Sequence, residues 1–375
     1  MITTRVTPKE TTMPIQFRKE LSQIKPYVQG KPVEVVRREF GLDRIEKLAS
    51  NENQFGPSPK AVAAMTEEIK NLNFYPEGYP FELTQKLSEK LGVAPERFMV
   101  GNGGESIIWT ISMTFLDAGD EIIVASPSFD IYKLSATLMG AKTVAVPLKD
   151  GGFDIDAMLA AVNEKTKIFW LCSPNNPTGN IADKTQINRI IEALPDHVVL
   201  VLDEAYYEFA SAREGFPTDS TSLLDIHENL IILRTLSKAY GIAGIRVGYV
   251  MTSSLIAEKL NSVKQTFGVN RLAQVGAKAA LDDDEYMAFV VRSNSEGIAA
   301  LEQYYESKGW DYFPSYANFS WVNCGRDSHV IFDALQRRGV IIRPGFLWGW
   351  DTWLRISTGT EEQIRFLKEQ LDEVL

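Results

Sequence analysis

The sequence predicts an α/β protein. A large domain would contain a mostly parallel seven-stranded sheet with helices on both faces, and a second domain would be smaller and α+β. Between residues 97 and 251, short apolar runs alternate with amphipathic stretches, the pattern of strands and helices in a parallel sheet. After Ser253 the pattern changes to long helical stretches, up to about Gly309. A chain of 375 residues has room for two to three domains.

The large domain is expected at residues 46–258, and residues 259–375 are expected in the small domain. Strands of the large domain are predicted from short apolar, β-branched runs at 98–100, 121–125, 143–147, 168–171, 198–202, 229–233 and 247–251. In the small domain, strands are predicted at 319–323, 340–343 and 354–356, and helices at 330–338 and 361–375.

Composition argues against several classes of protein. The formal charge of −10 disfavours nucleic acid or an anionic membrane as the main partner. No apolar run approaches the length of a membrane span, and residues 1–20 lack the apolar stretch of a signal peptide. Cys172 and Cys324 give no disulfide framework or zinc spacing, and the scattered histidines form no metal set. We therefore expect a cytoplasmic enzyme without a metal.

Lys238 is the most informative residue in the chain. It follows the predicted strand at 229–233, and parallel sheets bind ligands beyond such strand ends. A lysine amine can form a Schiff base with an aldehyde. The hydroxyls of Thr235 and Ser237 and the guanidinium of Arg246 can hold a phosphate. An aldehyde that carries a phosphate, such as pyridoxal phosphate, fits this set; the alternative is a surface lysine beside an ordinary loop.

Two further loops follow predicted strands. Residues 172–179 contain two prolines, two asparagines and a glycine, which make a fixed non-helical loop whose asparagine can donate a hydrogen bond to a phenolic oxygen. In the second loop, Asp203 can pair with a protonated pyridine nitrogen, and Tyr206 can reach the same phenolic oxygen. Each loop alone could be a turn or a helix cap. All three segments in this order favour a pyridoxal phosphate site.

With these segments the chain resembles the fold type I pyridoxal-phosphate aminotransferases, and within them the histidinol-phosphate aminotransferase branch. The motifs are specific for the superfamily and weak for the exact substrate, and they cover nearly the whole chain. They lie at residues 50–53, 75–78, 173–179, 203–206, 235–246 and 354–357. The resemblance also implies that an N-terminal arm, up to about residue 45, joins the small domain.

The resemblance implies a role for each candidate residue. Lys238 would hold the cofactor and act as general base, and Asp203 would keep the pyridine nitrogen protonated. Asn176 and Tyr206 would hold the phenolate oxygen. The phosphate would be bound by Thr235, Ser237, Arg246 and the backbone at Gly104.

The glycine-rich segment 101–106 follows a predicted strand and opens a helix, whose free N–H groups can bind phosphate. A dinucleotide fingerprint is the rival interpretation. It fails in part, because Ser106 stands at its last position and no acidic residue closes the next strand near Ala125. Relative to the family, Gly104 replaces a small polar residue and Glu105-Ser106 replaces an acidic pair. We expect backbone contacts to persist and leave the side-chain contact of Glu105 open.

For two aromatic residues, the sequence alone indicates a packing role, whereas the family resemblance implies contact with the cofactor. By sequence alone Phe129 is a core residue, but the resemblance implies that it stacks on the pyridine ring. Tyr75 alone would be a packed tyrosine in a turn. The resemblance implies instead that it reaches across a two-fold axis to the neighbour's cofactor phosphate, in a homodimer with shared sites.

Two arginines are candidates for substrate binding. Arg355 lies in a short apolar strand, where it needs either a structural ion pair or a substrate anion. The resemblance implies that it clamps the α-carboxylate and that Arg343 contacts the side-chain phosphate. The loop between them is crowded with aromatic residues that could be core or could line a pocket for a flat ring; they are Phe346, Trp348, Trp350 and Trp353.

Together with this resemblance, the sequence therefore predicts an aminotransferase that uses histidinol phosphate and 2-oxoglutarate. An aromatic amino acid aminotransferase for phenylalanine or tyrosine is the first alternative, and a decarboxylase or lyase on the same scaffold is another. A non-enzymatic sensor that binds pyridoxal phosphate is the alternative of another class. The first 45 residues are too few, and not basic enough, for the DNA-binding segment that such sensors carry.

Overall fold

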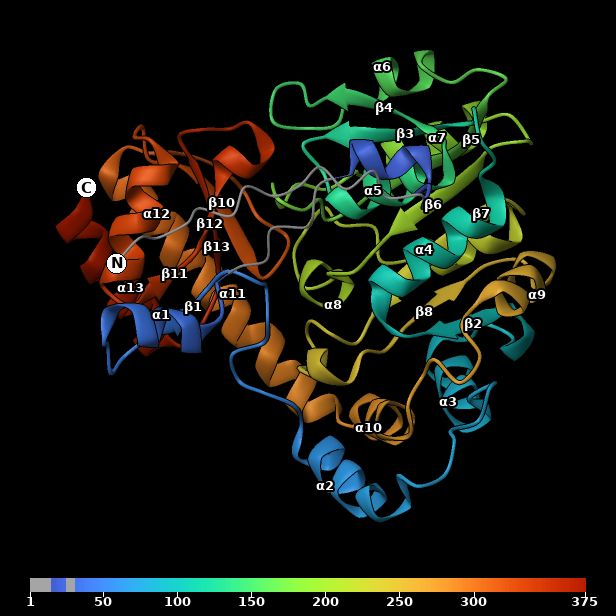
Figure 1. Cartoon of the computed structure of the whole chain (residues 1–375), viewed down its shortest axis with the longest axis horizontal. Helices are drawn as coiled ribbons and strands as arrows, with labels where there is room; N and C mark the ends of the chain where they lie inside the picture. Colours follow the sequence, from blue (N-terminus) through green and yellow to red (C-terminus); the bar gives the residue numbers. More distant parts are fainter. Residues whose placement is uncertain (1–14, 25–30) are drawn as a thin grey trace, which may run out of the picture.

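The computed structural model describes residues 15–24 and 31–375. A seven-stranded sheet forms the centre of the larger part of the molecule (Figure 1). In spatial order its strands are β2 (Phe98–Gly101), β8 (Gly248–Met251), β7 (Leu230–Thr235), β6 (Val199–Asp203), β5 (Thr166–Cys172), β3 (Glu121–Ser126) and β4 (Lys142–Pro147). Only β8 runs antiparallel to its neighbours within this sheet. The predicted mostly parallel seven-stranded sheet is confirmed.

Helices cover both faces of the sheet because successive side chains of each strand point to opposite faces. Ile122 of β3 packs in one core and Ile123 in the other. One face is covered by α4 (Gly103–Phe115), α5 (Asp130–Met139) and α9 (Ser254–Val263). The other face is covered by α2 (Pro59–Glu68), α3 (Phe81–Leu91), α6 (Ile155–Ala160), α7 (Lys184–Ala193) and α10 (Arg271–Leu281).

The smaller part of the molecule is an antiparallel four-stranded sheet with its own core. Its strands in order are β12 (Arg343–Pro344), β13 (Trp353–Ser357), β10 (Phe319–Asn323) and β9 (Asp311–Phe313). Its helices are α11 (Asp284–Lys308), α12 (Ser328–Arg337) and α13 (Glu361–Val374). The helix α13 begins with a reciprocal capping box between Thr360 and Gln363, which satisfies two backbone donors at the helix start.

Residues 33–47 of the N-terminal segment meet this smaller part, whereas the short helix η1 (Lys19–Gln23) contacts α5 of the larger part. The strand β1 (Glu46–Lys47) pairs in parallel with β11 (Val340–Ile341). The helix α1 (Val33–Phe40) buries Val36 in a small cluster with Ile341. Of the predicted arm, residues 1–14 and 25–30 lie outside the described residues.

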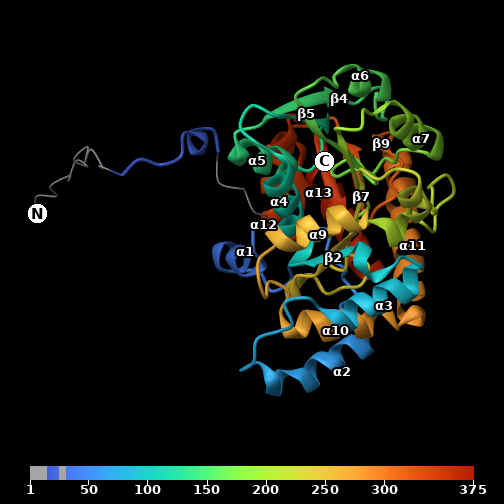
Figure 2. The ribbon, with the colours of Figure 1, turned by 90° about the vertical axis from the view of Figure 1, so that its right-hand side faces the viewer.

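The helix α10 packs against α2 and α3, and Figures 1 and 2 both show these three helices together at one end of the molecule. It is thus grouped in space with helices of the large sheet, although it follows residue 258. The proposed domain boundary at 258 stays a prediction. The remaining elements are short: η1 (Lys19–Gln23), η2 (Ile69–Asn71), η3 (Pro95–Arg97), α8 (Tyr207–Ala210), η4 (Ser220–Asp225), η5 (Ala243–Ile245) and η6 (Gly345–Trp348).

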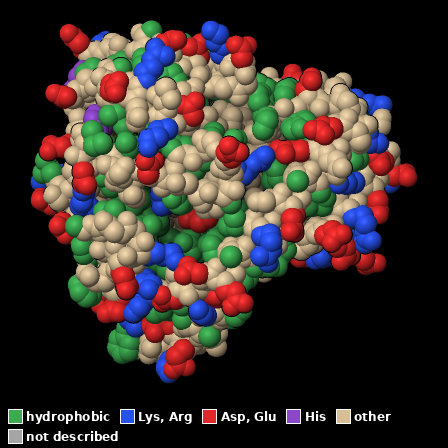
Figure 3. Space-filling model, turned by 180° about the vertical axis from the view of Figure 1, so that it is seen from behind, with side chains coloured by type: hydrophobic (Ala, Val, Ile, Leu, Met, Phe, Trp, Pro, Cys, Tyr) green, Lys and Arg blue, Asp and Glu red, His purple; other side chains and the backbone are tan. Residues whose placement is uncertain are grey.

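The face of the molecule seen in Figure 3 is mixed in charge. On the face seen in Figure 3, Lys and Arg side chains are interspersed with Asp and Glu, so that face carries no continuous basic surface. Among the described residues, no helix combines the length and the apolar character needed to cross a membrane.

Candidate active site

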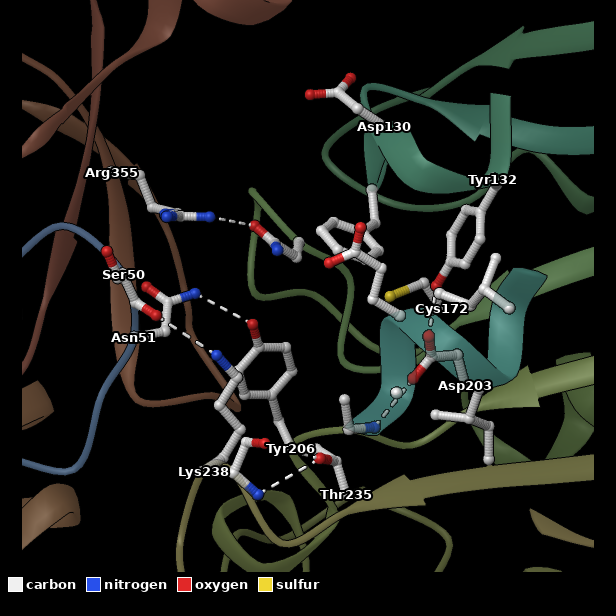
Figure 4. Close-up of a pocket in the computed structure, with 18 of the residues that line it drawn as sticks. Ser50, Asn51, Asp130, Tyr132, Cys172, Asp203, Tyr206, Thr235, Lys238 and Arg355 are labelled. Carbon is white, nitrogen blue, oxygen red and sulfur yellow. Dashed lines mark hydrogen bonds between the residues drawn. The ribbon is translucent and has the colours of Figure 1, made fainter. Parts of the chain in front are cut away.

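One cavity lies beyond the carboxyl ends of β5, β6 and β7, where the large sheet meets the small one (Figure 4). The cavity is lined by every predicted site residue except Tyr75. These lining residues are Gly104, Glu105, Phe129, Asn176, Asp203, Tyr206, Thr235, Ser237, Lys238, Arg246, Arg343 and Arg355. The parallel strands bring loops that are distant in sequence to one edge of the sheet, as expected for this topology.

Lys238 lies just beyond β7, and its Nζ donates to the carbonyl oxygen of Ser50 at 3.3 Å. Nζ lies 5.7 Å from the centre of the Tyr206 ring. Burial, with a smaller contribution from the charge of Arg355, lowers the pKa of the lysine ammonium to about 8. A larger fraction of this amine than of an ordinary lysine is therefore neutral, and nucleophilic, near neutral pH.

Asp203 ends β6 and is buried. Its Oδ2 accepts a hydrogen bond from the Tyr132 hydroxyl at 2.5 Å, and its Oδ1 accepts from the backbone N–H of Ala205 at 3.0 Å. Burial raises the pKa of the carboxyl to about 6, against the lowering effect of these two hydrogen bonds. A carboxyl with a pKa of about 6 can share a proton with a basic ring nitrogen.

Tyr206 and Asn176 each offer a donor group to the cavity. The Tyr206 oxygen accepts from Asn51 Nδ2 at 3.0 Å, which leaves the phenolic proton for another acceptor. Asn176 Oδ1 accepts from Arg355, which leaves the amide nitrogen as the donor of that side chain. The two groups could together hold one anionic oxygen.

Backbone and side-chain donors gather at the start of α4. Gly104 is in the first turn of this 13-residue helix, whose N–H groups favour an anion. A Cβ on Gly103 would lie 2.7 Å from a terminal guanidinium nitrogen of Arg246, so only glycine lets this arginine lie so close. Thr235 and Ser237 add hydroxyls 3.1 Å apart. Glu105, in the same turn, is exposed.

Phe129 precedes α5, lines the cavity and also packs against the core beneath it. Its ring makes an edge contact with Tyr132, with the ring centres 5.7 Å apart. Phe129 therefore belongs partly to the core and partly to the wall of the cavity.

Arg343 and Arg355 occupy the wall formed by the small sheet, and both are buried. The Arg355 guanidinium donates to the carbonyl oxygen of Ala49 at 2.6 Å and lies 5.4 Å from the centre of the Trp348 ring. Trp348 lines the cavity, whereas Trp350 and Trp353 pack with Trp321 away from it. Phe346 instead stacks on His329.

Tyr75 does not line the cavity. Its side chain is 80% exposed, and its ring stacks on that of Phe267 at 5.0 Å between centres. In a single chain this tyrosine has no contact with the candidate site.

The comparisons with known proteins agree with this geometry. The sequence profile of the family "Aminotransferase class I and II" matches residues 43–371. The chain belongs to the class I and II aminotransferases. It is 44% identical over 353 residues to histidinol-phosphate aminotransferase 2 of Carboxydothermus hydrogenoformans, covering 94% of this chain and 97% of that protein. It is 40% identical to histidinol-phosphate aminotransferase of Bacillus subtilis, covering 96% of this chain and 100% of that protein.

Solved structures of other aminotransferases have the same fold as this one. Histidinol-phosphate aminotransferase of Sinorhizobium meliloti, in complex with pyridoxal-5'-phosphate, has a TM-score of 0.89 at 28% identity, covering 97% of this chain and 98% of that one. Aspartate aminotransferase of Thermus thermophilus with maleate has a TM-score of 0.83 at 23% identity, covering 96% of this chain and 100% of that one, which shows the shared fold. The predicted fold and enzyme class, and the resemblance to the histidinol-phosphate branch, are confirmed.

The cavity of this aminotransferase fits pyridoxal phosphate. The amine of Lys238 and the carboxylate of Asp203 lie in one cavity, and an anion site at the start of α4 completes it. Donors from Asn176 and Tyr206 are available for the ring oxygen. These four features correspond to the aldehyde, ring nitrogen, phosphate and phenolic oxygen of that cofactor.

Other residues that line the cavity were not predicted as site residues; they are Ala49, Ser50, Asn51, Ile108, Asp130, Tyr132, Cys172, Ala205 and Leu233. Asn51 stands in the motif 50–53, but nothing in that motif indicates that it contacts Tyr206. Tyr132 is three residues after Phe129 and one turn into a helix, where an aromatic residue is more often part of the core. Only the structure shows that its hydroxyl reaches Asp203 at the end of β6.

Proposed function

We propose that this aminotransferase binds pyridoxal phosphate covalently through Lys238 and transfers the amino group of histidinol phosphate to 2-oxoglutarate, giving imidazole acetol phosphate and glutamate. The observation that carries the proposal is a partly buried lysine with a lowered pKa in the same cavity as a buried carboxylate and two buried arginines. The names of the relatives, 38–44% identical over most of the chain, support the choice of amino donor.

When bound, the cofactor supplies an electron sink that stabilises negative charge on the substrate carbon. Lys238 would hold the cofactor and, as a free amine, would act as the general base for the proton at the substrate carbon. Its lowered pKa suits this task, because the neutral amine must be present near neutral pH.

The other residues of the cavity bind and orient. Asp203 pairs with the ring nitrogen, and Asn176 and Tyr206 hold the ring oxygen. Phe129 stacks on the ring. The remaining contacts, all to the phosphate, come from Gly104 backbone, Thr235, Ser237 and Arg246, with Glu105 at the edge of the same turn.

For the substrates, we assign Arg343 to the phosphate of histidinol phosphate. Because that donor lacks an α-carboxylate, Arg355 serves the carboxylate of glutamate and 2-oxoglutarate. Trp348 favours a flat ring beside the arginines.

The second candidate function is transamination of phenylalanine or tyrosine, which Trp348 also favours. A donor screen decides between the two, with histidinol phosphate, phenylalanine and tyrosine each tested against 2-oxoglutarate. We expect the highest kcat/KM with histidinol phosphate. A higher value for an aromatic amino acid would favour the second candidate. Carbon dioxide release without a keto product would indicate a decarboxylase, and an unchanged visible band with every donor would indicate a sensor.

The assembly is part of the proposal. Several exposed apolar side chains lie near Tyr75 in sequence or, in the case of Phe267, stack on its ring; they are Ile69, Leu72, Phe74, Tyr79, Phe81 and Phe267. A two-fold contact through this surface would bury them and bring Tyr75 to the cofactor phosphate of the second subunit. We propose a homodimer on this basis, and a cytoplasmic location for the enzyme.

A further inference from the structure

Tyr132 makes the shortest contact of Asp203. The phenolic oxygen of Tyr132 lies 2.5 Å from Oδ2 of Asp203, and both side chains are buried. The two residues are 71 apart in sequence and meet because the Tyr132 side chain, from the first turn of α5, reaches Asp203 at the carboxyl end of β6 (Figure 4). An O–H to carboxylate hydrogen bond of this length is of the strong, charge-assisted kind.

The phenol has little freedom to turn away. Its ring stacks on that of Trp170 of β5, with centres 4.3 Å apart and planes 17° apart. The ring of Phe129 makes a T-shaped contact with the Tyr132 ring. Because Trp170 and Phe129 both contact the ring, the hydroxyl stays directed at the carboxylate, and the backbone N–H of Ala205 donates to the other carboxylate oxygen.

Tyr132 can only donate in this pair. Burial, together with the charge of Asp203, raises the pKa of the phenol well above its ordinary value, so the hydroxyl keeps its proton at any pH at which the enzyme works. Each carboxylate oxygen offers two lone pairs, so both oxygens of Asp203 retain one that can face the cavity.

The surroundings of Asp203 have opposing effects on its pKa. Burial and the neighbouring carboxylate of Glu204 raise the pKa of Asp203, whereas the Tyr132 hydroxyl, the Ala205 N–H and the Lys238 ammonium lower it. The Cys172 thiol, also beside this pair, is kept protonated by burial, which raises its pKa. Tyr132 is the neutral side-chain donor that favours the ionised carboxylate.

We propose that Tyr132 is a positioning residue that keeps Asp203 ionised and aimed at the ring nitrogen of the cofactor, so that the proton of the pair resides on that nitrogen. The inference rests on the proposed use of pyridoxal phosphate. Without the hydroxyl, the Asp203 carboxyl would hold the proton more strongly, and the ring nitrogen would lose it at a lower pH than in the wild type. The ring would then withdraw electrons less well.

The test is the substitution Tyr132→Phe, which keeps the ring stack and removes only the hydroxyl. The protonation of the ring nitrogen is followed by its ¹⁵N chemical shift in holoenzyme prepared with ¹⁵N-labelled cofactor, across a pH series. The cofactor dissociation constant is measured on apoprotein. Tyr305→Phe is the matched control, since Tyr305 is also buried and its hydroxyl meets Ser320 Oγ at 2.7 Å, away from the cavity.

In Tyr132→Phe we expect the nitrogen to lose its proton at a lower pH than in the wild type. We also expect cofactor affinity to fall by about tenfold or more, the effect of one charge-assisted hydrogen bond. The control should match the wild type in both. If Tyr132→Phe is too unstable to purify, 3-fluorotyrosine at this position supplies a more acidic donor and should shift the nitrogen in the opposite direction.

The inference would be overturned if Tyr132→Phe showed the nitrogen titration and the cofactor affinity of the wild type. It would also be overturned if fluorotyrosine left the titration unchanged. Neither outcome would affect the proposed function. Wild-type protein that binds no pyridoxal phosphate would instead overturn the proposed function itself.

Discussion

Arg343 and Arg355 are direct cross-strand partners in the antiparallel pair of β12 and β13. Both side chains are buried and line the same wall of the cavity. Two guanidinium groups on one wall suit a pair of anionic substrates, one that carries a phosphate and one that carries a carboxylate.

We predict that Arg343→Ala lowers kcat/KM for histidinol phosphate at least about tenfold, because a charge-assisted contact contributes roughly 1.5–3 kcal/mol. Turnover of phenylalanine, which carries no phosphate, should change little. The exposed Arg365 of α13 provides a control, and Arg365→Ala should leave both substrates unaffected. An equal loss on both substrates in Arg343→Ala would mean that this arginine supports the fold and does not select the donor.

The pKa of Lys238, lowered to about 8 mainly by burial, predicts a pH dependence for cofactor binding. Only the neutral amine attacks an aldehyde, so the rate at which apoprotein acquires the visible band should rise with pH below about 8 and level off above it. Arg355→Met removes a cation that disfavours the ammonium, so the midpoint should move to higher pH. A rate that still rises above pH 10 would show that burial does not control this amine.

Asn51 supports Tyr206 from an unusual backbone conformation, with φ of 55°. Besides its bond to Tyr206, its Oδ1 accepts from the Ser357 hydroxyl at 2.8 Å. Because glycine adopts this conformation without strain, Asn51→Gly tests the side chain alone. We expect a loss of roughly 1–3 kcal/mol in the free energy of unfolding, measured in urea, from the buried groups left unpaired. Asp150→Gly, at an exposed position with φ of 50°, is the control and should not destabilise the protein.

Because Tyr75 is exposed and is proposed to contact the cofactor of a second subunit, we predict that the protein sediments as a homodimer. We expect Tyr75→Phe to remain dimeric but to bind pyridoxal phosphate more weakly, because a phosphate contact from the second subunit is lost. A fully active monomer would refute the role of Tyr75 across the two-fold axis.

The large sheet was predictable because its buried strands are continuous apolar runs bounded by turn residues. The predicted strand at 168–171, for example, lies within β5 (Thr166–Cys172). The pairing of β1 with β11 was not predicted, because Glu46 and Lys47 carry no apolar pattern and their partners lie almost 300 residues away. The three-residue strand β9 is likewise too short to give a periodic signal.

Within the site, the sequence indicated the groups that follow strand ends, since a parallel sheet necessarily gathers them at one edge. Lys238, Asp203 and Asn176 are of this kind. Asn51 and Tyr132 reach the cavity through tertiary contacts between separate elements, with Ser357 and Trp170 respectively. A single sequence gives no sign of such contacts, so these two supporting residues emerged only from the structure.

The most direct measurement is the visible absorption spectrum of purified protein from which unbound pyridoxal phosphate has been removed. We predict a band near the violet edge in the wild type that is absent from Lys238→Ala. Lys264→Ala is the control, because burial also lowers the pKa of Lys264 to about 8, yet this lysine contacts the carbonyl of Val100 outside the cavity. Loss of the band in Lys238→Ala alone is the predicted result. A band that persists in Lys238→Ala, or one that disappears only in Lys264→Ala, would contradict the assignment of Lys238 as the residue that holds the cofactor.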